Sequence, residues 1–366
     1  MEGKNKKVTV IVPVHDAQEY LDEMLQSVLN QSYREMEVLL IENGSADQSL
    51  QLCRRWEQKD ERIRVYQEEI CGIGKARNRG MREAQGEYLC FVDADDYFSD
   101  LHILDKMIRI LEQTGADLAV CNYVRLWKER LLPAAGHEHF SILRPDSEDF
   151  RFQGFFSVGT LAYVWGKVYR KSFLTDHEIH FSDLEYGEDK VFNMQCYVCG
   201  ARYAFLEDRG YVYRNNEQSV MHNQNVHSGW LDAAHYFNAW TNDWAGKDQD
   251  RQKQSEYCRE LIAYLIFFGA FFDAKESEKT GYRDRWAVHR MLKCYGRDEL
   301  GHSCFLSLRR GVRSKMLSQR MWKWMLFAFS AGMSFHLYAV LALGIRFLIR
   351  HRVDEQLSDT GLREAQ

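Results

Sequence analysis

The first 120 residues alternate between short apolar runs and segments with helical periodicity. The strand-like runs are five or six residues long, as expected for strands of a parallel sheet, and they cover 8–12, 36–41, 62–66 and 88–92. The segments between them predict helices over 17–30, 47–58 and 74–84, and a helix over 101–113 and a strand over 117–121 follow. Right-handed crossovers bring the carboxyl ends of such strands to one edge of the sheet. The pattern therefore predicts an α/β fold with a Rossmann-like, mostly parallel sheet flanked by helices.

The rest of the chain divides into three further parts. The strict alternation ends near residue 125, and 126–222 contains loops with shorter helical and strand fragments. Residues 223–308 are almost wholly helical in pattern. Residues 309–366 form a basic and apolar tail. We therefore expect one α/β domain over 1–222, made of halves 1–125 and 126–222, followed by a helical extension.

One uncharged stretch in the tail, residues 324–345, is long enough to cross a bilayer as a single helix. Trp322 and Trp324 stand at one end of it, and Arg346 and Arg350 stand at the other, where they could reach lipid phosphates. Three interpretations remain open, namely a core helix, a helix lying on the membrane surface and a spanning anchor.

Composition narrows the functional classes and the compartment. The chain has 366 residues and a formal net charge of −5, and it lacks the aromatic-interleaved basic stripes of nucleic-acid-binding proteins, so no nucleic acid is expected as a partner. Nine cysteines are scattered along it, several inside apolar runs. This distribution indicates reduced thiols in the cytoplasm and not a disulfide framework.

The chemistry begins at Asp93-Ala94-Asp95-Asp96, directly after the predicted strand over 88–92. Open α/β folds bind ligands at this edge, and clustered carboxylates are stable there when a hard divalent cation lies between them. Such cations usually bring phosphate oxygens. The alternative is that Asp96 or Ser99 caps the helix that begins near Leu101. Three carboxylates favour a metal and diphosphate site.

Other loops at the same edge carry suitable groups. His15, after the first strand and Pro13, could stack on a nucleobase, and Asn43, after the second strand, could bond a base edge through its amide. Residues 72–80, GIGKARNRG, do not fit a dinucleotide fingerprint, which should follow the first strand and have glycine where Arg77 stands. They offer a phosphate cradle with Arg77, or simply a basic helix face.

The second half supplies a second acidic pair, Glu188 and Asp189, where a loop turns into a helix. Carboxylates at a helix start interact favourably with its dipole, which is the simpler explanation. Sugar transfer from a nucleotide, however, needs a base that takes the proton of the acceptor hydroxyl. Upstream, Trp165 offers an aromatic surface on which sugars stack, with the cation of Lys167 beside it.

These motifs together resemble the family 2 inverting glycosyltransferases, which have the GT-A fold, of the kind that build bacterial surface polysaccharides. The resemblance covers roughly residues 7–222 and rests on PVHDAQEYL (13–21), SVLNQSYREMEVLLIENGSAD (27–47), GIGKARNRG (72–80), GEYLCFVDADD (86–96), WGK (165–167) and GEDKVF (187–192). Two positions depart from the usual pattern. His15 replaces an aromatic residue, and Glu42-Asn43 replaces an acidic pair.

The resemblance implies roles for individual residues. Asp95 and Asp93 form the DXD motif that binds Mn²⁺ or Mg²⁺ and the donor, and His222 is either a third metal ligand or an ordinary loop histidine. Asp189 is implied as catalytic base with Glu188 as its neighbour. Pro13, His15, Asn43 and Arg77 are implied as donor contacts, and Trp165 and Lys167 are expected at the acceptor.

The expected activity follows from these roles. A metal-dependent hexosyl- or N-acetylhexosaminyltransferase would move a sugar from a nucleotide diphosphate sugar, with a UDP-sugar favoured, to a hydroxyl of a growing glycan. If the tail is membrane-bound, the acceptor would be lipid-linked and the enzyme would work on the cytoplasmic face of the cell membrane. Two alternatives remain. One is a catalytically idle scaffold that binds nucleotide sugar or glycan, and the other is a nucleotidyltransferase, which would also use paired carboxylates and a cation.

Overall fold

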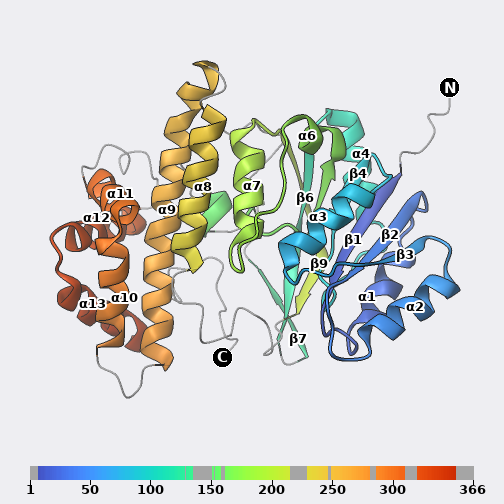
Figure 1. Cartoon of the computed structure of the whole chain (residues 1–366), viewed down its shortest axis with the longest axis horizontal. Coiled ribbons are helices and arrows are strands. Elements are labelled where there is room, and N and C mark those ends of the chain that lie inside the picture. Colours follow the sequence, from blue (N-terminus) through green and yellow to red (C-terminus); the bar gives the residue numbers. More distant parts are fainter. Residues whose placement is uncertain are drawn as a thin grey trace. The chain divides into compact units, whose positions relative to one another are not determined.

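A computed structural model describes residues 7–127, 129–134, 151, 153–157, 161–214, 229–245, 249–280, 286–309 and 320–351 (Figure 1). The chain forms two compact units. The first contains residues 1–144 and 160–219, and the second contains 145–159 and 220–366. Residues 145–159, which we expected in the α/β domain, thus belong to the second unit.

Four parallel strands and their crossover helices begin the first unit. They follow in the order β1 (Val8–Val14), α1 (Leu21–Leu29), β2 (Met36–Glu42), α2 (Ser49–Lys59), β3 (Ile63–Gln67), α3 (Ile73–Glu83) and β4 (Tyr88–Phe91). β1 pairs in parallel with both β2 and β4, and β2 pairs in parallel with β3. The predicted alternation of strands and helices is confirmed, because each predicted strand and helix of this region corresponds to one element of the structure.

The remaining strands change the sheet from parallel to mixed. They come with β5 (Tyr97–Phe98), α4 (Ile103–Thr114), β6 (Leu118–Trp127), β7 (Arg130–Pro133), β8 (Lys167–Arg170), α6 (Lys171–Asp176), α7 (Glu188–Val198) and β9 (Tyr203–Arg214). Among the described strands the order is β3-β2-β1-β4-β8-β6-β9-β5, with β7 paired to β6. β8 lies antiparallel between β4 and β6, and the sheet therefore brings residues 167–170 beside 88–91.

Both faces of this sheet are covered, because successive side chains of a strand point to opposite faces. Val8, Val10 and Val12 of β1 share one core with apolar residues of α1, α2 and α4. On the other face, Ile11 contacts the backbone of α3 so closely at Gly80 that a Cβ there would lie 2.3 Å from its Cγ2. The fold is the mostly parallel, helix-flanked sheet of the GT-A class.

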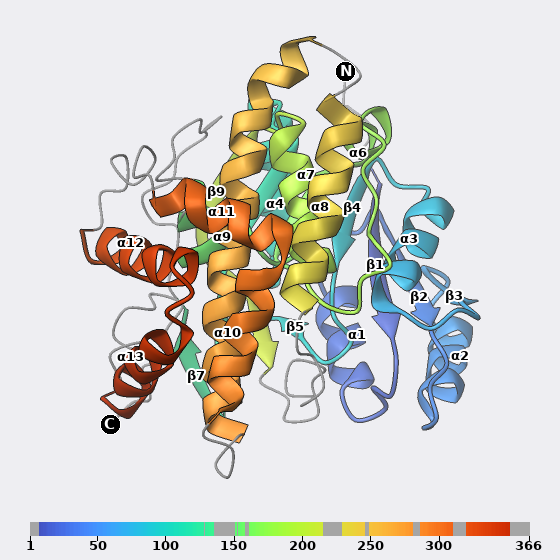
Figure 2. The same cartoon turned by 60° about the vertical axis from the view of Figure 1, so that its left-hand side comes forward.

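The second unit is helical. Its elements are a short π-helical turn η1 (Gln153–Ser157), α8 (Gly229–Ala245), α9 (Gln249–Thr280), α10 (Ala287–Arg297), α11 (Glu299–Arg309), α12 (Arg320–Ser334) and α13 (Tyr338–Arg350). α9 is the longest described helix and packs against α8, α10, α11 and α13 (Figure 2). Phe156 of η1 stacks on Phe268 of α9 with 5.0 Å between ring centroids. α9 thus forms the centre of this unit.

The uncharged stretch over 324–345 is not one helix, as we expected, but parts of two. α12 ends at Ser334, and His336 takes a left-handed conformation with φ of 59°. The amide of His336 donates to the carbonyl of Met333 (3.1 Å), and the amide of Leu337 donates to that of Gly332 (2.8 Å). This is a Schellman motif, which satisfies the last carbonyls of a helix and turns the chain away. No described helix is both long and apolar enough to cross a bilayer.

Candidate active site

The acidic segment after β4 forms a tight turn. The amide of Asp96 donates to the carbonyl of Asp93 at 3.1 Å, which closes the turn around Ala94 and Asp95. Asp93 and Asp95 are half-buried, whereas Asp96 is 1% exposed. The turn thus holds the two DXD carboxylates at the carboxyl edge of the sheet.

Asp96 joins this turn to β9. Its carboxylate accepts a hydrogen bond from the Tyr211 hydroxyl at 2.8 Å and from the Arg214 amide at 2.7 Å. Burial and the nearby Asp95 and Asp93 raise the pKa of Asp96 well above its ordinary value. Neither Asp96 nor Ser99 caps α4, because the Ser99 hydroxyl donates to the carbonyl of Arg209. The helix-cap alternative is therefore wrong.

Arg77 connects the turn with the second acidic pair. It lies in α3 and is 2% exposed. Its Nη2 donates to Oδ1 of Asp93 at 2.8 Å, and its Nη1 donates to Oε1 of Glu188 at 2.7 Å. One guanidinium thus bridges two carboxylates that are 95 positions apart in the sequence. The predicted contact of Arg77 to a donor stays a prediction, and the structure gives its charge a bridging role.

Glu188 and Asp189 lie in the first turn of α7, after Gly187, whose φ of 78° suits glycine. The charge of Arg77 interacts with Asp93, Glu188 and Asp189, and Lys190 also acts on Asp189. Burial and Asp189 raise the pKa of Glu188 to about 7, although Arg77 acts in the opposite direction. Burial also raises the pKa of Asp189, against the influence of Arg77 and Lys190. A carboxylate with a raised pKa is a better proton acceptor.

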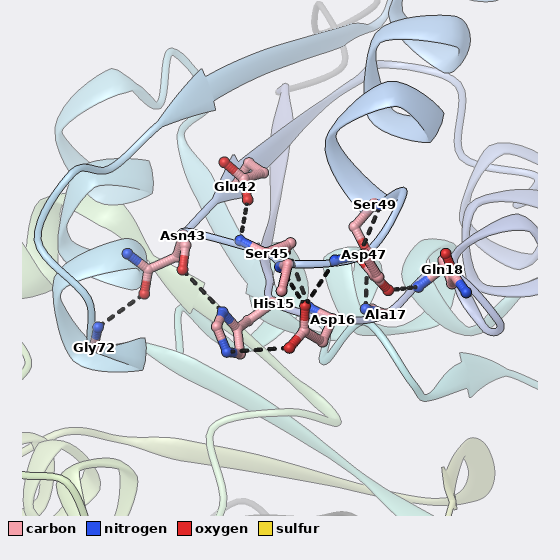
Figure 3. A network of polar contacts seen from close by, with 11 residues as sticks. His15, Asp16, Ala17, Gln18, Glu42, Asn43, Ser45, Asp47, Ser49 and Gly72 are labelled. Atoms are coloured by element: carbon pink, nitrogen blue, oxygen red, sulfur yellow. Dashed lines mark hydrogen bonds and ion pairs between the residues drawn. The ribbon is translucent and has the colours of Figure 1, made fainter.

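The loops after β1 and β2 form a hydrogen-bonded network (Figure 3). His15 lies between Asn43, whose carbonyl is 2.9 Å from its Nδ1, and Asp16, whose carboxylate is 3.7 Å from its Nε2. Asp16, with φ of 46°, accepts the amides of Ala46 and Asp47. The His15 side chain is still 54% exposed. Its ring is therefore fixed in place and open to solvent, as a stacking contact requires.

Asn43 is 4% exposed, and its side chain forms hydrogen bonds to the backbone of the protein. Its Nδ2 donates to the carbonyls of Glu68 and Ile70, both at 3.0 Å, and its Oδ1 accepts the amide of Gly72 at 2.8 Å. Both amide protons are thus used to hold the loop before α3. The predicted contact to a base edge stays a prediction, and it would have to use the second lone pair of Oδ1.

Trp165 is part of a buried aromatic stack and not an open platform. It is 5% exposed and lies between Tyr163 and Tyr211, at centroid distances of 4.5 and 4.8 Å and interplanar angles of 11° and 4°. Tyr213 stacks on it as well, at 5.4 Å. Tyr163 and Tyr213 are half-buried and pack against the core of the unit. The sequence did not indicate that Tyr163 and Tyr211 stack on Trp165, although aromatic residues at alternate positions of β9 were a signal for one face.

Lys167 is 2% exposed, and its ammonium donates to the backbone carbonyls of Tyr163 and Trp165. Burial lowers the pKa of Lys167 to about 7. The side chain therefore holds the turn that carries Trp165. Direct contacts of Trp165 and Lys167 to an acceptor stay predictions.

The carboxylates of the turn suit a divalent cation by their chemistry. Mn²⁺ and Mg²⁺ prefer oxygen ligands and usually take one or two carboxylates from the protein, with phosphate oxygens completing the set. Asp93 and Asp95 provide such a pair on one turn. Within the described ranges no three His, Cys, Asp or Glu side chains form a metal cluster. His222, the predicted third metal ligand, lies outside the described residues. Pro13, a predicted donor contact, is buried in β1.

Comparison with known proteins agrees with this fold. Residues 9–173 match the family described as Glycosyl transferase family 2. The glycosyltransferase EpsJ of Bacillus subtilis is 27% identical over 216 residues, which cover 58% of this chain and 62% of EpsJ. The poly(ribitol-phosphate) beta-N-acetylglucosaminyltransferase TarS of Staphylococcus aureus is 28% identical over 216 residues, 58% of this chain and 36% of TarS.

The fold is also similar to that of solved structures. TarS 1–349 in complex with UDP-GlcNAc has a TM-score of 0.67 at 20% identity, and the match covers 93% of this chain and 91% of that one. Residues 9–173 thus match a family 2 glycosyltransferase domain, and the described chain has the GT-A fold. The predicted family and fold class are thus confirmed.

Proposed function

We propose that the protein is an inverting glycosyltransferase that moves a sugar from a nucleotide diphosphate sugar to a hydroxyl of a growing glycan. The observation that carries this proposal is the bridge of Arg77 between Asp93 and Glu188, at 2.8 and 2.7 Å. A DXD turn and an acidic pair held together in this way meet two needs of sugar transfer at once. These needs are a site for the leaving diphosphate and a base for the acceptor.

Asp189 is the proposed base. It would accept the proton of the acceptor hydroxyl while that oxygen attacks the anomeric carbon on the side opposite to the diphosphate, so the configuration inverts. Its raised pKa, caused by burial, supports this role, because the best general base has a pKa close to the working pH. Glu188 and Arg77 would hold Asp189 and the DXD turn in one arrangement.

Asp93 and Asp95 are the proposed ligands of Mn²⁺ or Mg²⁺. The cation, when bound, would stabilise the negative charge of the departing diphosphate. His15 would stack on the base, and Asn43 would shape the loop beneath it. The similarity to TarS, a beta-N-acetylglucosaminyltransferase solved with UDP-GlcNAc, supports a UDP-sugar donor and an N-acetylhexosamine among the sugars to test.

The proposed acceptor is a lipid-linked glycan of cell-surface polysaccharide synthesis, reached at the cytoplasmic face of the membrane. The name of TarS, a poly(ribitol-phosphate) beta-N-acetylglucosaminyltransferase, supports a polymeric acceptor. The basic and apolar composition of residues 309–366 supports a membrane setting. The nucleotide released in the assay distinguishes this activity from nucleotidyl transfer, which would release pyrophosphate.

A donor panel tests the proposal. Thermal shift with UDP- and GDP-sugars, each with and without Mn²⁺, should identify a donor that stabilises the protein only when the cation is present. Transfer or slow donor hydrolysis should then release the nucleoside diphosphate. Asp189→Asn should bind this donor as the natural protein does and should have lost turnover. A panel without any saturable binding, or full turnover by Asp189→Asn, would contradict the proposal.

A further inference from the structure

The two last described helices of the chain expose large apolar side chains. Of the thirteen large apolar side chains that are strongly exposed in the described part of the chain, seven lie on α12, α13 or the turn between them. They are Trp324 (71%), Phe327 (42%), Phe335 (62%), Leu337 (49%), Val340 (62%), Leu343 (65%) and Phe347 (59%). Such a concentration is unusual, because single exposed apolar residues are normally scattered over a protein surface.

These side chains follow helical spacing. In α13 the residues 340, 343 and 347 are separated by three and four positions, and in α12 the residues 324 and 327 are separated by three. Residues so spaced lie on one face of a helix. Each helix thus has one apolar face directed to solvent, and we call these two faces with the turn between them the α12–α13 surface.

The opposite faces of both helices are already occupied. Phe329 of α12 packs edge-on against Phe267 of α9 at 5.2 Å and lies 5.9 Å from the ring of Phe305 in α11. In α13, Tyr338, Ala342 and Ile345 are buried. The exposed apolar residues are therefore not needed for the core of the unit. A surface helix without a second partner would have polar residues at these positions.

The charge of this region selects the partner. Between Glu299 and Asp354 the sequence contains nine Lys and Arg residues and no Asp or Glu, although the whole chain has a net charge of −5. Arg350 is exposed at the end of α13, and the guanidinium of Arg309 lies over the ring of Phe335 at 4.6 Å. Aromatic and aliphatic side chains combined with basic ones match an anionic bilayer, whose headgroups attract cations and whose acyl chains accept apolar groups.

We infer that the α12–α13 surface binds the interface of an anionic lipid bilayer. Helices of 15 and 13 residues are about 20 Å long at 1.5 Å per residue, which suits helices that lie along the headgroup region. Trp324 and the three phenylalanines would enter the interface, where aromatic residues are favoured. The inference depends on the proposed function only for the purpose of membrane binding, which is to bring the enzyme to a lipid-linked acceptor.

Flotation of the full-length protein with lipid vesicles tests this inference. The protein should bind vesicles of phosphatidylcholine with about a third of phosphatidylglycerol, and should bind pure phosphatidylcholine and high-salt samples more weakly. The double variant Leu343→Glu/Phe347→Glu should lower the partition coefficient by at least roughly tenfold for each side chain exchanged. Leu101→Glu, at a side chain that is 55% exposed in the first unit, is the matched control and should bind as the natural protein does.

A second readout separates loss of binding from loss of folding. Brominated lipids should quench tryptophan fluorescence in the natural protein, and Trp324→Phe should lose most of this quenching while it still floats. Absence of binding to anionic vesicles, or binding that Leu343→Glu/Phe347→Glu leaves unchanged, overturns the inference. A dimer in vesicle-free sedimentation that the double variant dissociates also overturns it, because the surface would then join two copies of this chain.

Failure of the inference and failure of the proposed function are distinguishable. Donor turnover with a soluble acceptor tests the transfer reaction alone, and neither Leu343 nor Phe347 belongs to the proposed catalytic machinery. Vesicle binding without any turnover would leave the surface in place and contradict the proposed function. Turnover without vesicle binding would do the opposite.

Discussion

Replacement of Arg77 by methionine tests the bridge at the centre of the site. Methionine keeps much of the volume of the side chain and removes its charge. The guanidinium is 3% exposed, and its partners Glu188 and Asp93 are 10% and 22% exposed, so their carboxylates would lose their cation in a poorly hydrated place. Removal of one partner from a buried ion pair costs about 3–5 kcal/mol of stability. We therefore expect Arg77→Met to lower the free energy of local unfolding of α3 and α7 by about this amount.

The penalty should depend on pH with a definite sign. Without Arg77 the pKa of Glu188, already raised to about 7, rises further, because the influence that lowers it is gone. At low pH the Glu188 carboxylate of the variant binds a proton and loses its unpaired charge. At high pH it stays charged and without a cation. The cost of Arg77→Met should therefore grow between about pH 6 and pH 9.

Hydrogen exchange measured by mass spectrometry is the suitable assay, because it follows α3 and α7 separately from the second unit. Arg79→Met is the matched control. Arg79 lies on the same helix, is 36% exposed and pairs with Glu83 at 3.0 Å, so its loss should cost less than about 1 kcal/mol.

The double variant Arg77→Met/Glu188→Gln completes the test. It should recover at least about 1 kcal/mol of what Arg77→Met loses, because a neutral amide replaces the carboxylate left without its cation. Equal costs for Arg77→Met and Arg79→Met, or strictly additive effects in the double variant, would refute the bridging role.

Four further predictions concern the same unit. Asp189→Asn should lower transfer by about 10²–10⁴-fold, with unchanged donor affinity by calorimetry, since only proton acceptance is lost. Asp95→Asn should weaken Mn²⁺ binding by roughly tenfold or more in thermal-shift titrations; unchanged affinity would speak against Asp95 as a ligand. The pKa of Glu188 is raised from 4.5 to about 7, so its contribution to stability is complete below about pH 4.5 and is lost as the pH rises through 7. Glu188→Gln should flatten that part of the pH-stability curve. Gly80→Ala should cost about 1–3 kcal/mol in urea unfolding, because its Cβ would lie 2.3 Å from Cγ2 of Ile11; an equally stable or more stable variant would contradict this close contact.

The local pattern of the chain was enough to predict the first half of the fold. β1, β2 and β4 are mostly apolar and wholly buried, whereas β3 alternates between buried and exposed residues, and each intervening helix has its own amphipathic period. The same rules placed the acidic turn after β4 at the carboxyl edge. These features depend on neighbours within a few residues, and a single sequence therefore reveals them.

The position of β8 was decided by tertiary structure. Lys167–Arg170 pairs antiparallel with Tyr88–Cys90, about 80 residues earlier, and nothing in four residues specifies that partner. The same insertion buries Lys167, whose charge had indicated an exposed contact. Strand order depends on which edges are free after the first half has formed.

The sequence by itself determined the alternation of strands and helices, the acidic turn and the acidic pair as separate motifs. Only the folded chain joined the two motifs through Arg77, buried Asn43 and Trp165 within hydrogen-bonded and stacked networks, and ended α12 at His336. The physical reason is the range of the forces involved. Periodicity and turn propensity act over a few residues, whereas burial and ion pairing depend on groups that only the complete fold brings together.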